Sequence, residues 1–222
     1  MNERLIPLFK EEGIKKLSEA TVAVVGVGGV GGICAIALAR CGVGNIIIQD
    51  FDVVEESNIN RQIVANYNTI GLSKVDVLEK QIKEINPKCN VIKLNSFFDK
   101  DNLMLFSYNI DYIVDAIDSF TSKCLLIEKC IENNIQFISS MGAAKKLDPS
   151  KVSITKINKT SYDPLAKKIR TYFKNNNFYV VSSTEDTKCD ELGSYFVVVE
   201  TFGLLCAHHI ITKIVGELKN WF

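Results

Sequence analysis

Short apolar runs alternate with longer amphipathic stretches along most of this chain. Runs rich in Val and Ile predict buried strands, whereas apolar residues three and four positions apart predict helices. The predicted strands are 22–25, 46–49, 90–95, 111–117, 135–140, 152–157, 178–182 and 195–201. The predicted helices are 3–18, 30–41, 73–85, 123–133, 164–175 and 204–218. The alternation predicts an α/β fold: a Rossmann-like, doubly wound, mostly parallel sheet with an additional antiparallel C-terminal portion.

The length and the most apolar stretch favour one folded domain. A chain of 222 residues suits one generous α/β domain and is too short for two of full size. The most apolar stretch, 196–215, contains Glu200, His208, His209 and Lys213. These polar residues favour a core strand followed by a core helix over a membrane span. We therefore expect no membrane association.

The cysteines and the N-terminus indicate the compartment. Seven cysteines are scattered singly among apolar neighbours, at positions 34, 41, 89, 124, 130, 189 and 206, and none forms a C-x-x-C pair. This spacing argues against a zinc ribbon or a disulfide framework and favours reduced thiols. The first 13 residues are charged rather than signal-like, so a cytoplasmic location is expected.

A glycine-rich turn follows the first predicted strand. Gly26, Gly28 and Gly31 keep the spacing G-x-G-x-x-G, and a predicted helix follows directly. Glycine permits a tight turn in which backbone N–H groups approach a phosphate, and the helix N-terminus favours the same anion. The second strand leads to Asp50, about 20 residues beyond the turn, where a carboxylate binds a ribose hydroxyl. This half of the sequence predicts a nucleotide site.

Three more polar residues are predicted at the same edge of the sheet. Arg61 follows the ribose carboxylate, Lys74 starts a helix after the N-cap Ser73, and Asp118 ends a strand. Each has an ordinary explanation alone, because exposed Arg and Lys are mostly surface charges and a strand-end Asp is often a helix cap. Together with Asp50 they supply a ribose ligand, two cations for phosphates and a carboxylate for Mg²⁺, which are the groups that ATP chemistry needs.

These motifs, with Asp52 and the run Asn-Ile-Asn-Arg-Gln at 58–62, resemble the ThiF-type, ubiquitin-activating-like adenylating enzymes. The resemblance implies that Arg61, Lys74 and Asp118 are catalytic, and that Asp118 binds Mg²⁺. It also implies a set of ATP-binding residues: Gly26, Gly28, Gly29, Gly31, Asp50, Asp52, Ser57, Asn58, Asn60, Arg61, Lys74, Asp118 and Ser119, with Arg4 from a neighbouring subunit. The implied product class is an acyl-adenylate.

Later segments resemble one tRNA-modifying branch of that superfamily. They are 138–149, 159–160, 163–170 and the Thr-Phe-Gly of 201–203. Enzymes of this branch are dimeric and use ATP to close the threonylcarbamoyl side chain of a tRNA adenosine into a ring with loss of water, through adenylation of its carboxylate. The resemblance implies one adenylating domain over 1–222, with a nucleotide-binding core in 1–145 and a substrate-binding and dimerisation portion in 146–222.

The charge distribution agrees with a polyanionic substrate. Nine basic residues and two acids lie between Lys145 and Lys174, so this segment carries +7 in a chain of net charge zero. Phosphate contacts dominate nucleic-acid affinity, although an ordinary basic surface would have the same composition. The predicted tRNA-binding residues are Lys145, Lys146, Lys167, Lys168 and Arg170.

Several alternatives stay open at this point. The chain could adenylate a small sulfur-carrier or ubiquitin-like protein ending in Gly-Gly, or bind nucleotide without catalysis. The glycine turn alone also allows a nicotinamide-dependent dehydrogenase. Residues 175–193 look short for the family, and the sequence does not say whether Cys189 accepts sulfur from a transfer partner, whether Na⁺ or K⁺ binds at a dimer interface, or which tRNAs are used.

Overall fold

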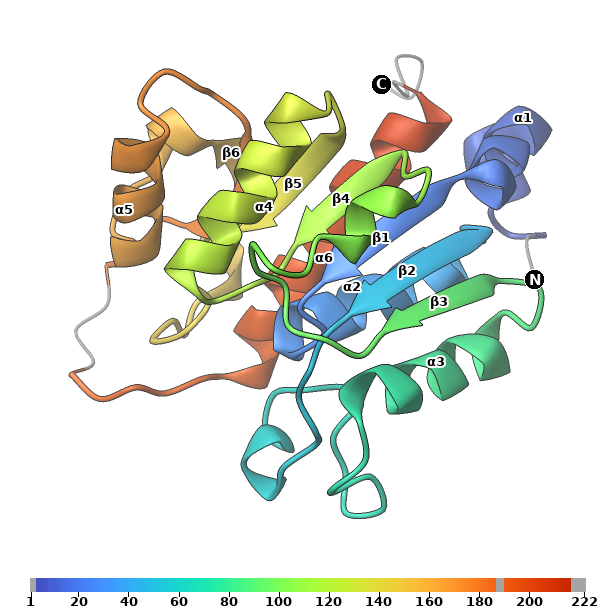
Figure 1. The fold of residues 1–222 in the computed structure, drawn as a ribbon, viewed down its shortest axis with the longest axis horizontal. Helices are drawn as coiled ribbons and strands as arrows, with labels where there is room; N and C mark the ends of the chain where they lie inside the picture. The colour runs from blue at the N-terminus through green and yellow to red at the C-terminus, as the bar shows by residue number, and fades with distance from the viewer. Residues whose placement is uncertain (1–2, 187–189, 217–222) are drawn as a thin grey trace.

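The computed structural model describes residues 3–186 and 190–216 (Figure 1). Its centre is a seven-stranded sheet of order β3-β2-β1-β4-β5-β7-β6. The strands are β1 (Thr21–Val25), β2 (Asn45–Gln49), β3 (Asn90–Leu94), β4 (Tyr112–Asp115), β5 (Gln136–Ser140), β6 (Val152–Lys156) and β7 (Tyr179–Ser183). All pairs are parallel except β6 with β7. The predicted fold class is therefore confirmed.

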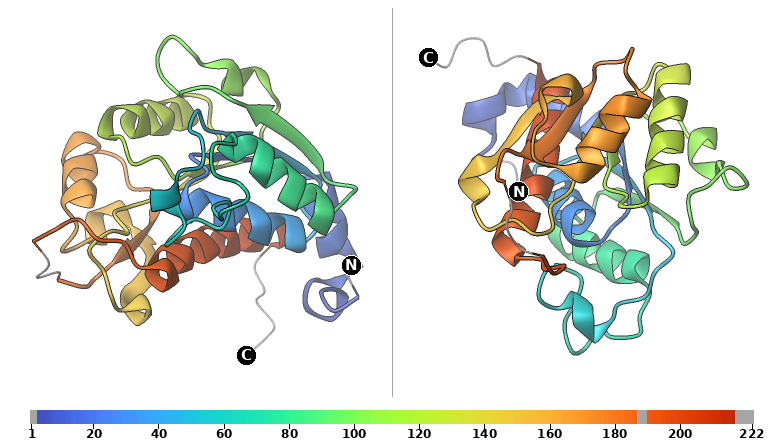
Figure 2. Two further views of the ribbon diagram at one scale, coloured as in Figure 1. Left: turned by 90° about the horizontal axis from the view of Figure 1, so that it is seen from below. Right: turned by 90° about the vertical axis from the view of Figure 1, so that its left-hand side faces the viewer.

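Helices cover both faces of this sheet. They are α1 (Ile6–Glu19), α2 (Gly29–Arg40), α3 (Lys74–Ile85), α4 (Phe120–Glu132), α5 (Pro164–Tyr172) and α6 (Phe196–Val215), with short 3₁₀ helices at Glu56–Asn58, Met104–Ser107, Pro149–Lys151 and Ile157–Lys159. The apolar residues of α2, α3 and α6 form the core of one face, and α4 and α5 pack on the other. Figure 2 shows α2 and α6 side by side along their length.

The predicted strand at 195–201 is wrong, because these residues form the first turns of α6. Val198, Phe202 and Cys206, each one helical turn after the last, are fully buried. A Cβ atom at Gly203 would lie 2.3 Å from the carbonyl oxygen of Val30, so glycine permits α6 to cross α2 closely. This packing overrides the strand preference of the valines. The predicted end of this helix at residue 218 lies outside the described residues.

The length and apolar composition of α6 would suit a membrane span, and it is the one helix in the described part of the chain that meets both criteria. In this structure α6 packs against α2, α1 and the strands β5 to β7, and 61% of its most apolar window is buried. It therefore forms part of the core, as the sequence predicted for 204–218.

The sheet also shows how the two halves of the chain are joined. Strand β7 pairs with β5, so the elements after residue 145 extend the same sheet that carries the glycine turn. The division of roles at that boundary stays a prediction. Figure 1 shows α1 beside the amino ends of the parallel strands, opposite the edge to which their arrows point. Ligands of such sheets bind at the carboxyl edge.

Candidate functional site

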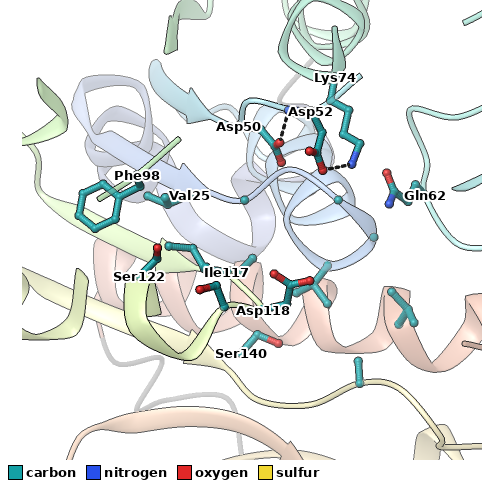
Figure 3. A pocket seen from close by; sticks show the side chains of 18 of the residues that line it. Val25, Asp50, Asp52, Gln62, Lys74, Phe98, Ile117, Asp118, Ser122 and Ser140 are labelled. Atoms are coloured by element: carbon teal, nitrogen blue, oxygen red, sulfur yellow. Dashed lines mark hydrogen bonds and ion pairs between the residues drawn. The ribbon is translucent and has the colours of Figure 1, made fainter. Parts of the chain in front are cut away.

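A cavity of about 410 Å³ opens at the carboxyl ends of β1, β2, β4 and β5 (Figure 3). One wall is the glycine turn, and a second contains Asp50, Phe51 and Asp52. Residues 116–119 and 140–144 form two further walls. The site therefore lies where the order of an open parallel sheet predicts it.

The glycines of the turn have different roles. Gly26 has φ +83°, and a Cβ atom there would lie 2.7 Å from the carbonyl oxygen of Ala116. At Gly31 a Cβ atom would lie 1.8 Å from the carbonyl oxygen of Gly26, so this glycine permits close packing of α2 on the turn. Gly28 and Gly29 line the cavity, whereas Gly31 is buried outside its lining. Gly31 therefore acts on the shape of the turn, and a direct contact between Gly31 and a nucleotide stays a prediction.

The carboxylate of Asp50 is fixed by two backbone groups. Its Oδ2 accepts a hydrogen bond from the N–H of Val27 at 2.7 Å, and its Oδ1 accepts one from the N–H of Asp52 at 2.9 Å. Because Val27 lies between two glycines of the turn, Asp50 holds the turn and the end of β2 in one arrangement. The same carboxylate lines the cavity, where it can accept a hydrogen bond from a hydroxyl group.

Arg61 reaches the cavity from the polar loop after the 3₁₀ helix Glu56–Asn58. Its Nη1 donates to the carbonyl oxygen of Ser57 at 2.7 Å and to Oδ1 of Asn60 at 3.0 Å. The amide of Asn60 donates in turn to the carbonyl oxygen of Ser194. Ser57 and Asn60 do not line the cavity. They hold the guanidinium group, whose remaining donors suit a phosphate.

Lys74 is the first residue of α3 and is almost completely buried. Its Nζ atom lies 2.8 Å from Oδ2 of Asp52, whose side chain is 44% exposed. Figure 3 shows this ion pair beside Asp50 at the edge of the cavity. The predicted N-cap Ser73 is confirmed in position, although its side chain makes no capping hydrogen bond.

Asp118 lies at the mouth of the cavity, in the turn between β4 and α4. Its carboxylate is exposed and makes no hydrogen bond or ion pair within residues 3–186 and 190–216. Carboxylate oxygens are the ligands that Mg²⁺ prefers, and Mg²⁺ in such sites uses one or two carboxylates together with substrate phosphates. The donor set at this position therefore fits a magnesium ion that is shared with a nucleotide.

The cavity brings together most of the residues predicted from sequence. Those in its lining are Gly26, Gly28, Gly29, Asp50, Asp52, Asn58, Arg61, Lys74, Asp118 and Ser119. Gly31, Ser57 and Asn60 lie outside the lining. Arg4 is exposed and precedes α1, which lies at the opposite edge of the sheet (Figure 1). Its contribution to the site of a neighbouring subunit stays a prediction.

The basic segment is only partly free to contact a polyanion. Lys167 and Lys168 are exposed on α5, and the neighbouring Leu165 lines the cavity. Lys146, however, is buried, and its Nζ donates to the carbonyl oxygens of Tyr162 and Glu185. The charge of Lys146 is thus already paired with acceptors inside the chain, and a tRNA contact of Lys146 stays a prediction. A buried ammonium group needs several acceptors, and this one holds the loop after β5 in place.

Lys145 and Arg170 also make contacts within the chain. Nζ of Lys145 donates to the carbonyl oxygen of Asp190 at 2.6 Å, and Nη1 of Arg170 donates to that of Thr160 at 2.9 Å. Both side chains are half-buried. They therefore stabilise loops near the cavity, and their charged groups are less available to a polyanion than those of Lys167 and Lys168.

Several residues that line the cavity were not predicted from the sequence. Gln62, Phe97 and Ser122 line it, and Phe51 meets Phe97 edge to face with ring centroids 4.9 Å apart. Gln62 is the last residue of the Asn-Ile-Asn-Arg-Gln motif at 58–62, and this motif could have indicated its place in the site. The aromatic residues follow the ends of β2 and β3, so their position at the carboxyl edge was a further signal.

The described cysteines do not supply a reactive thiol. Cys34, Cys89, Cys124, Cys130 and Cys206 are buried, and Cys41 is half-buried with a thiol pKa that burial raises. Burial raises the pKa of the Cys124 and Cys89 thiols to about 11, and that of Cys206 to about 12. A nucleophilic cysteine needs a lowered pKa. Cys189 lies outside the described residues.

Comparisons with known proteins identify relatives of this chain. The chain is 46% identical over 162 residues to a tRNA threonylcarbamoyladenosine dehydratase of Bacillus subtilis, covering 72% of this chain and 64% of the relative. It is 37% identical over 204 residues to the Escherichia coli enzyme of that name, covering 90% and 76% of the two chains. The crystal structure of that E. coli enzyme, TcdA, in complex with ATP matches with a TM-score of 0.91 and 34% identity, over 98% of this chain and 94% of the other.

The alignment with the B. subtilis relative spans less than two thirds of that protein's length. The sequence profile of the ThiF family, in contrast, matches residues 2–221, which is nearly all of this chain. The resemblance to ThiF-type adenylating enzymes is therefore confirmed: the chain belongs to the ThiF family.

Proposed function

We propose that this protein is an ATP-dependent tRNA threonylcarbamoyladenosine dehydratase. The observation that carries the proposal is one cavity that collects Asp50, Arg61, Lys74 and Asp118 from four separate segments. A solved relative of the same fold binds ATP, and two relatives at 37% and 46% identity have this activity in their names. The proposed reaction closes the threonylcarbamoyl side chain into a ring and releases AMP and pyrophosphate.

The residues of the cavity suit the parts of ATP. The N–H groups of the glycine turn and the N-terminus of α2 favour phosphates. Asp50 accepts from the ribose, and Arg61 and Lys74 offset the negative charge that develops when pyrophosphate leaves. Lys74 is held 2.8 Å from Asp52, so it is oriented before the nucleotide binds. Asp118 would hold Mg²⁺, which polarises phosphate oxygens when it is bound.

The substrate supplies the other reacting groups. The threonyl carboxylate attacks the α-phosphate of ATP, the bond to the β-phosphate breaks, and pyrophosphate leaves to give an acyl-adenylate. A nucleophilic group on the same modified nucleoside then attacks the activated carbonyl carbon, and AMP is released. No protein thiol is needed for this sequence. The raised pKa of the described buried cysteines is compatible with that requirement.

The position of α5 supports a tRNA substrate. Leu165, in its first turn, lines the cavity, and Lys167 and Lys168 lie exposed two and three residues beyond it. A tRNA whose modified base entered the cavity would place its phosphates near these lysines.

We propose a cytoplasmic homodimer in which Arg4 reaches the phosphates of the neighbouring subunit's ATP. The sequence leaves open whether a sulfur-transfer partner exists and whether Na⁺ or K⁺ binds, and both stay untested.

The decisive experiment is a nucleoside assay. The protein is incubated with ATP, Mg²⁺ and tRNA bearing threonylcarbamoyladenosine, and the digested nucleosides are analysed by mass spectrometry while AMP is measured. We expect equal amounts of AMP and of a nucleoside lighter by one water, and neither product with tRNA that lacks the modification. ATP binding without any AMP or mass change would contradict the proposal. AMP formation that requires instead a small protein ending in Gly-Gly would assign the chain to the sulfur-carrier class.

A further inference from the structure

A fully buried ion pair lies beneath the cavity. Asp115, the last residue of β4, and Lys123, in the first turns of α4, both have completely buried side chains, and Lys123 Nζ lies 2.8 Å from Asp115 Oδ2. Neither residue lines the cavity. Neither residue is among the site residues predicted from sequence, because the network also needs Ser139 and Ser140 from β5.

Every donor of the buried ammonium group has an acceptor. Nζ of Lys123 donates to Asp115 Oδ2, to the carbonyl oxygen of Ser140 at 2.9 Å and to Oγ of Ser139 at 3.3 Å. The hydroxyl of Ser139 donates to the same Oδ2 of Asp115. Burying two charges costs desolvation energy, and well-packed apolar residues of similar volume often give equal or greater stability. Stability alone is therefore a weak explanation for this pair.

The pair connects two separate walls of the cavity. Oδ1 of Asp115 accepts a hydrogen bond from the N–H of Ile117 at 3.1 Å, which fixes the turn that carries Asp118. The bond from Lys123 to the carbonyl oxygen of Ser140 fixes the end of β5, where the chain enters the wall at 140–144. Figure 3 shows Ile117, Asp118 and Ser140 around the same cavity. The ammonium group thus joins the two walls at the ends of β4 and β5, which are also paired through their backbones.

The second of these walls is held from its other side as well. Oδ2 of Asp163 accepts from the N–H of Gly142 at 2.8 Å, while Oδ1 of the same carboxylate accepts from the N–H of Ala166 and caps α5. The wall at 140–144 is therefore fixed between α4, through Lys123, and α5, through Asp163. A segment held at both ends is suited to present a substrate group at a defined place.

We propose that Asp115 and Lys123 are positioning residues for adenylation: they hold the Asp118 turn and the 140–144 wall at the separation that the reacting carboxylate and ATP require. This inference rests on the proposed function. The pair touches neither substrate. It acts through Asp118 and through the backbone of the 140–144 wall.

The test separates position from stability. In Lys123→Met the carboxylate of Asp115 stays buried without its partner, so both folding stability and rate should fall. In the double variant Asp115→Leu/Lys123→Met no buried charge remains at this place, and the melting temperature should return toward that of the wild type. We expect the rate of AMP formation in the double variant to stay about 100-fold low, with the Kd for ATP within about threefold of wild type. Lys129→Met, on the same helix in a partly exposed pair with Glu132, is the matched control and should keep the wild-type rate.

A second measurement does not depend on turnover. Hydrogen exchange should be faster in the double variant for peptides that contain 116–119 and 140–144, and unchanged for β1 to β3. A double variant that recovers its melting temperature and also shows wild-type exchange in both walls and a wild-type rate would overturn the inference. If the wild-type protein formed no AMP with modified tRNA, the proposed function would fail, and the exchange pattern alone would decide the positioning role.

Discussion

The Nζ atom of Lys74 lies 2.8 Å from Oδ2 of Asp52, and the lysine side chain is 6% exposed. The stem of Lys74 is thus buried, while its ammonium group lies beside Asp52 in the lining of the cavity. The backbone N–H of Lys74 also donates to the carbonyl oxygen of Asp52. Two bonds therefore bind the first residue of α3 to the segment that follows Asp50, and the ammonium group has one preferred position.

Replacing this ammonium group should affect the chemical step. We expect Lys74→Ala and Arg61→Ala each to lower the single-turnover rate of AMP formation by about 100-fold or more, because each removes a positioned cation from a transition state that gains charge. The control is Lys93→Ala, since Lys93 pairs with Asp76 and Glu79 away from the cavity lining. Near-wild-type rates in both cavity variants would show that the phosphate roles are misassigned.

The glycine turn gives a prediction about folding. At Gly31 an added Cβ atom would lie 1.8 Å from the carbonyl oxygen of Gly26, whereas at Gly28 the nearest atom would be the flexible amide of Gln62 at 3.5 Å. We expect Gly31→Ala to lower the free energy of unfolding by about 3 kcal/mol or more, or to prevent folding, because backbone atoms would have to move. Gly28→Ala should cost less than about 1 kcal/mol. Chemical denaturation of both variants checks this, and equal losses would contradict it.

The parts of this site that could be predicted from sequence are those set by local structure. Gly26, Gly28 and Asp50 belong to one strand–turn–helix–strand unit, so their spacing along the chain fixes their proximity in space. The placement of Asp118 followed from a simple rule, because a residue at the carboxyl end of a parallel strand faces the ligand edge. These residues are found together in the structure.

The features that sequence missed depend on partners far along the chain. Lys146 looked like a surface cation, yet its acceptors are the carbonyl oxygens of Tyr162 and Glu185. The role of Lys123 depends likewise on Ser139 and Ser140, on another strand. For 195–201 the β-branched residues favour a strand. Long-range packing of α6, most of all against α2, favours a helix instead. No local pattern reports such long-range contacts.

Glu200 gives the chain a specific pH dependence. Its side chain is buried in α6, and both carboxylate oxygens have no hydrogen-bond partner among the residues that the structure describes. Burial raises its pKa from 4.5 to about 7. Because the folded-state pKa is raised, the protonated form contributes stability that is fully present below about pH 4.5 and is lost as pH rises through about 7. Ionisation of Glu200 at higher pH should therefore lower the free energy of unfolding by roughly 3 kcal/mol.

The variant that tests this is Glu200→Met, which keeps the volume and removes the charge. Its unfolding free energy, measured by urea denaturation, should exceed that of wild type at pH 8 and approach the wild-type value near pH 5. The control is Glu84→Met, since that carboxylate is exposed on α3 and the substitution should not change the slope of stability against pH. An equal difference between Glu200→Met and wild type at both pH values would mean that the carboxyl group does not titrate with folding.

The exposed lysines of α5 provide the final test, which concerns the second substrate. Reversing both charges in Lys167→Glu/Lys168→Glu should weaken tRNA binding and flatten its dependence on salt, because fewer counterions are released from the tRNA when it binds. Binding of ATP should not change, since neither lysine lines the cavity. The control is Lys80→Glu/Lys88→Glu, which changes the net charge equally at exposed positions in and after α3. If both double variants reduce tRNA affinity to the same extent, only the overall charge matters, and α5 is not the tRNA-binding surface.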